Sequence, residues 1–340
     1  MILTACSAPG IASETQIAAT PLPTSTPTAH LYWVPGDATA TPTPFRPLPP
    51  TPVYIPAGAT LSPEDTLVPT LATPPPQNLS AVGLIQAPKG VMNVLLLGSD
   101  QRSKKASLFR TDVIILASLN PDKGTVSLVS FPRDLWVQIP GYGQDRINTA
   151  YERGGFNTLA DTLQYNFGVH PDHFVVIKFS SFKDVVDSLG GLQVNVGQPL
   201  TDRRGCCYVT VKKGVQTMNA DTLLWYVRSR KTTNDFARNV RQQEVLQAIG
   251  NKLMSMDAIR RAPELYSAYI NSVSTDLHLM DMLTYLPLAA QLTDLSRIHH
   301  YFVTSGMTTD WITPGGAMVL LPNRDAIINV IRKALKGNGD

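Results

Sequence analysis

Short runs of aliphatic residues, separated by turn residues, recur through the chain after residue 90 and predict buried strands. They are rich in Val, Ile and Leu, as strands buried on both faces usually are. The sequence NPDKG between the second and third runs predicts a tight turn. The runs lie at residues 93–98, 112–119, 125–131, 173–179, 192–196 and 299–304.

Helical periodicity fills the intervals between these runs. Leu159, Leu163 and Phe167 recur every four residues, which predicts an amphipathic helix that ends at Gly168. Strands that alternate with helices predict an α/β fold, with a mixed central β-sheet flanked by helices on both faces in three layers. The other expected helices lie at 180–191 with a Ser N-cap, at 219–230, at 235–255, in two or three pieces within 257–294, and at 324–335.

The first 88 residues have a different composition. Residues 7–88 contain 18 of the 27 prolines and few large apolar residues, so we expect a disordered, semi-extended tether rich in Pro, Thr and Ala. We therefore place one globular domain at residues 89–338.

Residues 3–6 read Leu-Thr-Ala-Cys and resemble a bacterial lipobox, in which the Cys, here Cys6, receives lipid. The charged and apolar regions of a signal peptide are missing before it. Residues 1–6 are thus either the remnant of a truncated signal, which the tether behind them favours, or a chance match.

Charge is moderate overall and is concentrated in the domain. Without residues 1–88, which hold Arg46 and four acidic residues, the chain has 28 Lys and Arg against 22 Asp and Glu. This mildly basic balance is compatible with an anionic ligand.

Charged residues follow or open the first three predicted strands. Asp100 comes directly after the first strand, Arg110 and Asp112 open the second, and Arg133 and Asp134 follow the third. Because α/β folds place ligands at strand ends, we expect these side chains to line a site. A glycine-bearing loop that ends at Arg146 and Asn148 follows them.

The stretch YVRSRKTTNDFARNVRQQ, residues 226–243, brings four arginines and a lysine to the junction of two predicted helices. The apolar positions of the second helix extend back to Gln242 and Arg238, which should therefore face inward. Arg241 falls to the side of that face and has no explanation in this pattern. Cations at a helix start oppose the helix dipole, and a bound anion reverses that cost. Guanidinium groups suit phosphate oxygens, so the junction predicts a phosphate site.

Each of these residues also has a simpler explanation. Arg238 has Asp235 three residues before it as a local partner, and Arg228 and Arg230 are favourably placed at the end of a helix. Taken together, several arginines and two carboxylates suggest a pyrophosphate with a divalent ion such as Mg²⁺. The sequence contains no GxxxxGK[ST], HExxH or GxSxG motif to support a P-loop, zinc-protease or serine-triad enzyme.

These motifs, in this order and spacing, resemble the LytR-CpsA-Psr family of extracytoplasmic bacterial enzymes of cell-envelope assembly. The resemblance covers about residues 90–335 and rests on the segments NVLLLGSDQR, FRTDVIILASLNPDKGTVSLVSFPRDLW, HFVVIKFSSFKDVVDSLGGLQV and YVRSR…DFARNVRQQ. It implies a phosphotransferase that moves a teichoic-acid-like or capsule-like glycopolymer from polyprenyl pyrophosphate to a peptidoglycan sugar hydroxyl. It also implies an apolar tunnel for the lipid and a location at the outer face of the cytoplasmic membrane.

The resemblance assigns roles residue by residue. Asp100 and Asp112 would hold Mg²⁺, and Asp235 would accept the proton of the acceptor hydroxyl. Arg133 and Arg238 would act with Asp235 in catalysis. The residues that would hold the pyrophosphate are Arg110, Arg133, Arg228, Arg230, Arg238 and Gln242.

Two other functions stay open at this point. A hydrolase would cleave the same pyrophosphate with water, and the sequence does not separate water from a sugar hydroxyl. The other hypothesis is a non-catalytic protein that binds a lipid phosphate or a nucleic acid. The sequence has no helix-turn-helix pattern or basic recognition helix, so we do not expect nucleic acid as a partner.

Overall fold

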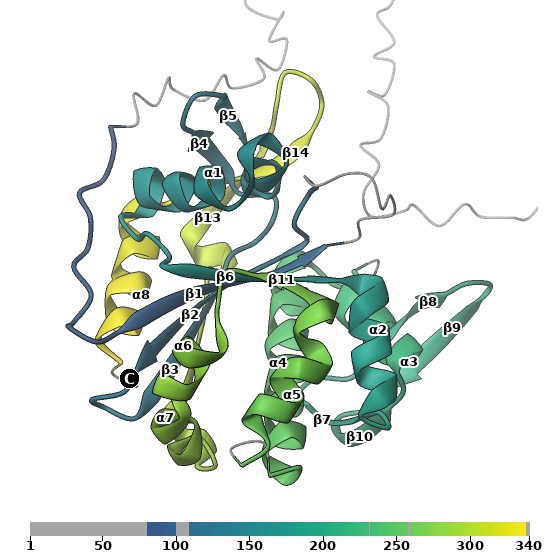
Figure 1. Cartoon of the computed structure of the whole chain (residues 1–340). Helices are drawn as coiled ribbons and strands as arrows, with labels where there is room; N and C mark the ends of the chain where they lie inside the picture. The colour runs from purple at the N-terminus through teal and green to yellow at the C-terminus, as the bar shows by residue number, and fades with distance from the viewer. Residues whose placement is uncertain (1–79, 100–108, 231, 258–259, 338–340) are drawn as a thin grey trace, which may run out of the picture. The chain divides into compact units, whose positions relative to one another are not determined.

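The computed structural model describes residues 80–99, 109–230, 232–257 and 260–337. Within these residues, six strands form a central sheet in the order β11-β6-β1-β2-β3-β12 (Figure 1). The β1/β6 and β3/β12 pairs are parallel and the others antiparallel, which confirms the expected mixed sheet. The strands are β1 (Met92–Ser99), β2 (Val113–Asn120), β3 (Thr125–Ser130), β6 (His173–Lys178), β11 (Val273–Thr275) and β12 (Ile298–Phe302).

Successive residues of these strands serve the two faces of the sheet in turn. Leu95 and Leu97 of β1 pack into the main core, whereas Val94 and Leu96 line cavities on the opposite face. The same alternation places Val176 of β6 in the core. The continuous aliphatic runs in the sequence are therefore strands covered on both sides.

One face of the sheet is covered by α1 (Ala150–Phe167), which follows η1 (Ile147–Thr149), and by α8 (Arg324–Lys336). The rings of Phe131 and Phe167 stack there with centroids 5.8 Å apart. Helix α1 begins at Ala150, nine residues before Leu159, the first of the predicted apolar positions, and it bends at Gly154 and Gly155, whose backbone angles are not helical. It ends at Gly168, as predicted.

The other face carries α4 (Asp235–Ser255), with further helices beside it (Figure 1). Gln243 fixes α4 to the sheet, because its buried amide donates to the Ser130 hydroxyl at 2.7 Å and to the Tyr301 carbonyl at 3.2 Å. Helices on both faces confirm the three-layer architecture. The further helices are α2 (Phe179–Ser188), α3 (Ala220–Arg228), α5 (Ala262–Tyr269), η2 (Ile270–Ser272), α6 (Leu279–Thr284) and α7 (Leu286–Gln291).

The predicted Ser N-cap of the helix after β6 is wrong. Helix α2 begins at Phe179 and its N-cap is Lys178, which makes no side-chain capping bond. The strand runs directly into the helix here, so no polar cap residue intervenes. None of the helices in the described residues is both long enough and apolar enough to cross a membrane.

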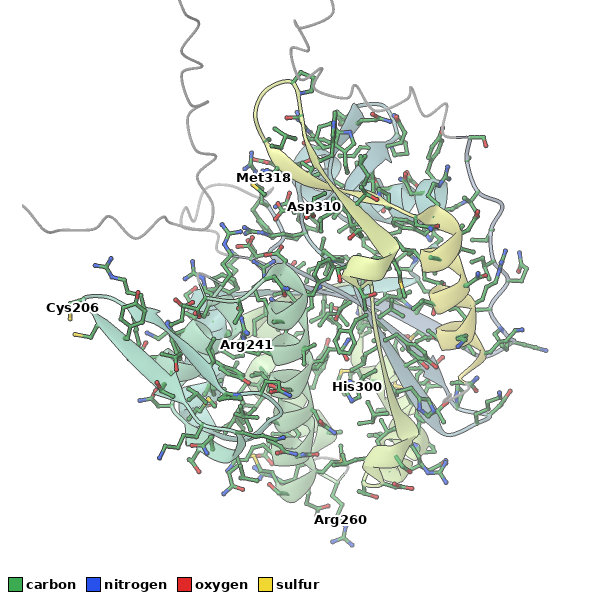
Figure 2. All side chains as sticks on the ribbon, turned by 180° about the vertical axis from the view of Figure 1, so that it is seen from behind. Cys206, Arg241, Arg260, His300, Asp310 and Met318 are labelled. Carbon is green, nitrogen blue, oxygen red and sulfur yellow. The ribbon has the colours of Figure 1, made fainter. Side chains whose placement is uncertain are left out.

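Four two-stranded ribbons and two short turns complete the domain, and the sequence pattern indicated only β7 among these strands. The β8–β9 ribbon has the exposed free thiols Cys206 and Cys207 at its turn (Figure 2). The ribbons pair β4 (Trp136–Ile139) with β5 (Gly143–Arg146), β7 (Leu192–Val196) with β10 (Gly214–Met218), β8 (Leu200–Arg204) with β9 (Cys207–Val211), and β13 (Thr308–Ile312) with β14 (Met318–Pro322); the turns are η3 (Leu295–Arg297) and η4 (Ser305–Met307).

The domain starts earlier than residue 89. Val82 and Ile85 pack against the core, and their backbone amides donate to the carbonyls of Tyr165 at 3.0 Å and Gly168 at 2.7 Å. The segment 80–88 therefore belongs to the domain and not to the expected tether. The rest of that tether, and Cys6, lie outside the described residues.

Gly168 tests this packing, because it has a positive φ of 72° and a Cβ there would lie 2.7 Å from the Gly83 carbonyl oxygen. Gly141 is a matched control, with a φ of 80° and nothing within 4 Å of an added Cβ. We expect Gly141→Ala to lower the free energy of unfolding by about 1–2 kcal/mol through backbone strain alone. Gly168→Ala should lower it by roughly 1–3 kcal/mol more, because the segment 80–88 must move. Urea unfolding measures both variants, and equal losses would show that the segment does not pack on α1.

Candidate active site

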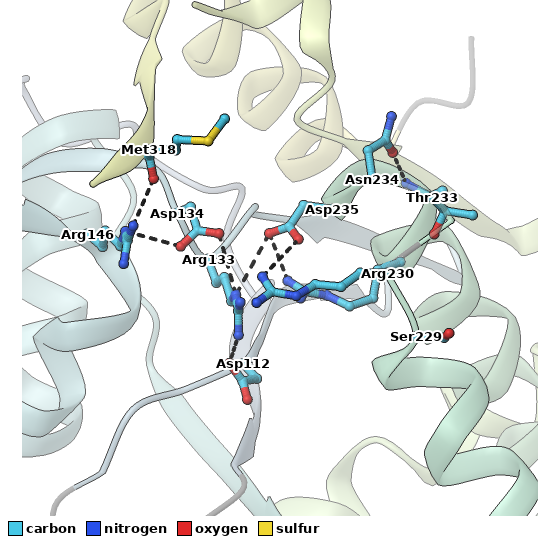
Figure 3. Close-up of polar contacts among 12 residues, drawn as sticks. Asp112, Arg133, Asp134, Arg146, Ser229, Arg230, Thr233, Asn234, Asp235 and Met318 are labelled. Atoms are coloured by element: carbon cyan, nitrogen blue, oxygen red, sulfur yellow. Dashed lines mark hydrogen bonds and ion pairs between the residues drawn. The ribbon is translucent and has the colours of Figure 1, made fainter. Parts of the chain in front are cut away.

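A cluster of charged side chains forms where the start of β2 and the end of β3 approach the start of α4 (Figure 3). Arg133 lies at its centre. Its guanidinium forms an ion pair with Asp112, and its Nε lies 3.5 Å from Asp134 and 3.9 Å from Asp235. Side chains from three separate segments of the sequence thus converge on one arginine.

Backbone hydrogen bonds hold these segments together. The Asp112 amide donates to the Gly98 carbonyl at 2.8 Å, and the Asn148 amide donates to the Arg133 carbonyl at 3.3 Å. The Thr111 amide in turn donates to the Asn148 carbonyl at 3.2 Å. The charged side chains are therefore carried by backbone that is bonded to the sheet and to the β5–η1 segment.

The junction of α3 and α4 supplies the other half of the cluster. Asn234 caps α4 by accepting a hydrogen bond from the Ala237 amide at 2.9 Å. Arg238, one turn later, donates to Asp235 at 2.9 Å, and its side chain is only 4% exposed. The prediction that Arg238 and Gln242 face inward is confirmed, since both are buried.

Arg241 is buried as well, and its expected position at the side of the helix is wrong. Its guanidinium donates to the carbonyls of Tyr226 at 2.9 Å and of Ser229, and to the Thr233 hydroxyl at 3.2 Å. The α3–α4 connection folds over the helix start and presents these oxygens to it. Arg241 is thus a brace that shapes the loop.

The predicted pyrophosphate residues do not all reach the cluster. Arg230 lies 3.9 Å from Asp235, whereas the Arg228 guanidinium lies 4.8 Å from the centre of the Phe179 ring. Gln242 donates to the Val227 carbonyl at 3.3 Å. Arg110 is exposed and pairs at 3.0 Å with Glu152 of α1, away from Arg133.

Two further charged residues, Asp134 and Arg146, belong to the cluster. The sequence placed them near the other charged residues but gave them no role. Arg146 lies 3.2 Å from Asp134 and donates to the Met318 carbonyl at 2.8 Å (Figure 3). Asp134 thereby connects Arg133 to Arg146. The sequence signal for Asp134 was its position next to Arg133 at a strand end.

Burial and charge act against each other in this cluster. Burial raises the pKa of Asp235, and although Arg238 and Arg133 favour its charged form, the charge of Asp134 and a hydrogen bond to it add to the rise. Burial alone lowers the pKa of Arg133, but the hydrogen bond to Asp112 and the charges of three carboxylates raise it overall. Burial lowers the pKa of Arg238.

Some buried donors of the cluster have no hydrogen-bond partner in the described residues. They include Nε of Arg133 and Nε of Arg238 and, close by in sequence, the Asn239 amide nitrogen. Buried N–H groups without acceptors are rare in proteins. An anion that enters the cluster would supply acceptors for them.

The structure describes one of the two predicted metal ligands. Asp112 lies in the cluster, and Asp100 lies outside the described residues. Among the residues with described positions, no three His, Cys, Asp or Glu side chains form a metal-binding group. The donors present are carboxylate oxygens, which fit the preference of Mg²⁺ for one or two carboxylates together with phosphate oxygens.

Two apolar cavities lie between the sheet and the helices on the α4 side. The proximal cavity, of about 430 Å³, is lined by Gly98, Phe179 and Gln242 at the end nearest the charged cluster, and by aliphatic residues that include Ile249. The distal cavity has a volume of about 490 Å³. Both are lined by Leu96, Val175, Leu253, Tyr269, Val273 and Met282. The two cavities are therefore neighbours with a common apolar wall, and we refer to them together as the apolar channel.

Comparisons with known proteins agree with this geometry. The sequence model of the LytR_cpsA_psr family matches residues 72–318. The chain is 32% identical over 219 residues to the polyisoprenyl-teichoic acid–peptidoglycan teichoic acid transferase TagT of Bacillus subtilis, an alignment that covers 62% of this chain and 67% of TagT.

Solved structures are similar over most of the domain. The crystal structure of B. subtilis TagV has a TM-score of 0.62 and 26% identity, and the match covers 73% of this chain and 97% of TagV. The family protein YwtF (TagT) with bound octaprenyl pyrophosphate lipid has a TM-score of 0.54 and 26% identity, and the match covers 77% of this chain and 96% of that one.

The raised pKa of Asp235 predicts a pH dependence of stability. The unfolded chain releases this proton near the ordinary Asp pKa of about 3.9, and the folded chain releases it only at higher pH. Between these two values the wild type should lose stability as the pH rises, relative to Asp235→Asn, which does not ionise. The loss should be about 1.4 kcal/mol for each unit of the shift. Urea unfolding of both proteins from pH 3.5 to 7.5 measures it, and a relative gain of the wild type over this window would contradict the shift.

Proposed function

The chain belongs to the LytR-CpsA-Psr family, and on this basis we propose that it is a glycopolymer-phosphate transferase. Its donor is a glycopolymer linked to polyprenyl pyrophosphate, of the teichoic-acid or capsule type. Its acceptor is a sugar hydroxyl of peptidoglycan. The names of its relatives support this donor and acceptor, since TagT is called a polyisoprenyl-teichoic acid–peptidoglycan teichoic acid transferase.

The observation that carries the proposal is a charged cluster at the end of an apolar channel. Gly98 and Gln242 line the channel where it approaches the arginines. A polyprenyl pyrophosphate has the same two parts, a long apolar chain and a compact anionic head. A channel with this lining buries the chain and leaves the head beside Arg133 and Arg238.

The arginines have a defined role in the reaction. The acceptor oxygen attacks the phosphorus that bears the glycan, and the bond from this phosphorus to the bridging oxygen breaks. The glycan phosphate becomes a phosphodiester, and polyprenyl phosphate leaves with the bridging oxygen and its negative charge. Arg133 and Arg238 stabilise that charge, since phosphoryl transfer depends mainly on positioning and electrostatic stabilisation.

Asp235 is the group that takes the proton from the acceptor hydroxyl. Its carboxylate lies between Arg133 and Arg238 and is mostly buried. A raised pKa brings it closer to neutral pH, where a general base is most effective. Its pairing with Arg238 keeps a useful fraction ionised.

The remaining predicted residues contact the pyrophosphate from its sides. Arg230 is next to Asp235, and Arg228 stands over Phe179 at the channel. Arg110 contributes once its pair with Glu152 opens. Asp112, with Asp100, would hold Mg²⁺, which when bound neutralises charge on the phosphate oxygens.

This function places the domain outside the cytoplasm, where peptidoglycan is built. Attachment to the outer face of the membrane through Cys6, or through a preceding membrane segment, remains a prediction from the sequence.

Arg133 gives the sharpest test of the site. We expect Arg133→Ala to reduce transfer by about a hundredfold to a thousandfold, which is typical for the loss of one group that stabilises transition-state charge. Arg133→Lys should recover part of the loss, because it restores the charge without the planar pair of donors. Arg332→Ala, an exposed arginine of α8, is the control.

The assay combines a lipid-pyrophosphate glycan with peptidoglycan oligomers and detects the joined product. Full activity of Arg133→Ala would contradict the site. Release of free phosphorylated glycan without any joined product would identify the protein as a hydrolase.

The channel is tested by filling it. Ile249→Trp adds bulk to the proximal cavity, and Val240→Trp adds the same bulk on the same helix, where Val240 is 40% exposed and lines neither cavity. We expect Ile249→Trp to lower kcat/KM about tenfold or more for an octaprenyl donor, because one excess group in an apolar site already discriminates by this much. A donor that carries a methyl group in place of the prenyl chain does not enter the cavity and should be affected far less. Equal effects on both donors would argue against lipid in the channel.

A further inference from the structure

A third cavity, of about 430 Å³, lies between β8 and α3 on the side of the charged cluster away from Arg146. We call it the basic pocket. Four of its nine lining residues are arginines, namely Arg203, Arg204, Arg228 and Arg230. The family resemblance implies a role in pyrophosphate binding for Arg228 and Arg230, and none for Arg203 and Arg204.

The acidic residues of the basic pocket are already engaged. Asp202 is 1% exposed and accepts hydrogen bonds from the Ser229 hydroxyl and, at 2.6 Å, from the Arg203 amide. Asp221 pairs with Lys183, and this hydrogen bond lowers the pKa of Asp221.

Three of the four arginines, by contrast, have neutral partners. Arg203 donates to the Gly205 carbonyl at 3.0 Å and Arg204 to the Thr222 hydroxyl at 3.1 Å. Among the described residues, no ion pair joins either of them, or Arg228, to a carboxylate. The basic pocket therefore has a surplus of positive charge, which an anionic ligand would balance.

One wall of the basic pocket is aromatic. The Trp225 indole N–H donates to the Arg203 carbonyl at 3.1 Å, which fixes the ring against β8. An aromatic face beside charged donors suits a ligand that is apolar in one part and ionised in another. A sugar ring with C–H groups on its face and an attached phosphate is such a ligand.

The basic pocket also lies beside the regions proposed for the lipid and for the pyrophosphate of the donor. Arg228 lines it and stands 4.8 Å from Phe179, which lines the apolar channel, while Arg230 lines it and lies 3.9 Å from Asp235. The basic pocket thus adjoins both the channel and the charged cluster, so a glycan attached to a pyrophosphate in the cluster can reach it.

We propose that the basic pocket binds the first anionic segment of the donor glycan, a stretch of sugars or polyols that bears phosphate or carboxylate groups. The proposal rests on the proposed function for the identity of the ligand. It makes Arg203, Arg204 and Trp225 determinants of donor specificity, and it predicts that the protein prefers anionic glycopolymers to neutral ones.

Binding of soluble probes to the full chain tests this without any transfer reaction. The probes are an oligo(glycerol phosphate), an uncharged oligosaccharide of similar length, and a soluble peptidoglycan fragment, each titrated by calorimetry at low salt. We expect the phosphate oligomer to bind most tightly. The double variant Arg203→Gln, Arg204→Gln should weaken it about tenfold or more, because charge-assisted hydrogen bonds are lost.

The matched control is Lys212→Gln with Lys213→Gln, which removes two exposed positive charges outside the basic pocket. It should change the affinity less than about twofold, since exposed charges act weakly at a distance. Equal losses in both double variants, or equal binding of the charged and uncharged probes, would overturn the proposal. Tighter binding of the peptidoglycan fragment at Arg203 and Arg204 would assign the basic pocket to the acceptor instead.

The probes contain no pyrophosphate and no lipid. A chain that fails to transfer can therefore still bind the oligomer at the basic pocket, and a chain that transfers can fail to bind it. Failure of one proposal therefore does not imply failure of the other.

Discussion

The ion pair between Arg238 and Asp235 is the interaction on which the site depends. Arg238 is 3% exposed, and an unpaired guanidinium at that depth is strongly destabilising. Asp235, at the start of α4, provides the opposite charge at 2.9 Å and also faces Arg133 and Arg230. The start of the helix, the end of β3 and the loop after α3 are therefore held in one arrangement by the need to balance buried charge. The arginines are thus positioned by carboxylates of the chain itself, which lowers the entropy lost when an anion binds to them.

The sheet meets a second constraint, because one face must form a core and the other must leave space. Leu95 and Leu97 pack under α1 and α8, and the intervening Leu96 lines the channel. A channel wall made of a sheet needs anchors that keep the opposite helix from collapsing onto it. Gln243 is such an anchor, since its amide reaches β3 and β12 through Ser130 and Tyr301. Buried and fully bonded polar groups of this kind specify one position of a helix on a sheet.

The sequence predicted the parts of the fold whose signal is local. Strand runs, the helix from Asp235 to Ser255 and the inward positions of Arg238 and Gln242 follow from periodicity and were found. Arg241 had no explanation in the sequence because its partners are the carbonyls of Tyr226 in α3 and of Ser229 just after it, and no residue pattern shows how this connection folds onto α4. The β8–β9 ribbon was missed because its alternation is polar, as in LTDRR. Arg110 pairs with Glu152, 42 residues away, and such a pairing depends on tertiary structure.

The charges of the cluster are balanced by carboxylates from distant segments of the chain, and the cluster can still take up an anion. At rest, Arg133 is balanced by Asp112, Asp134 and Asp235, which come from three different segments. A pyrophosphate that enters brings negative charge to the arginines and opposes the carboxylates already there. Like charges raise the pKa of a carboxylate, so a bound pyrophosphate would raise the pKa of Asp235, already raised by burial, and make its carboxylate a stronger base. An acceptor hydroxyl that approaches such a carboxylate meets a base whose proton affinity has just increased. In the proposed reaction, the anion that binds the arginines would therefore also make Asp235 a better acceptor for the proton of the acceptor hydroxyl.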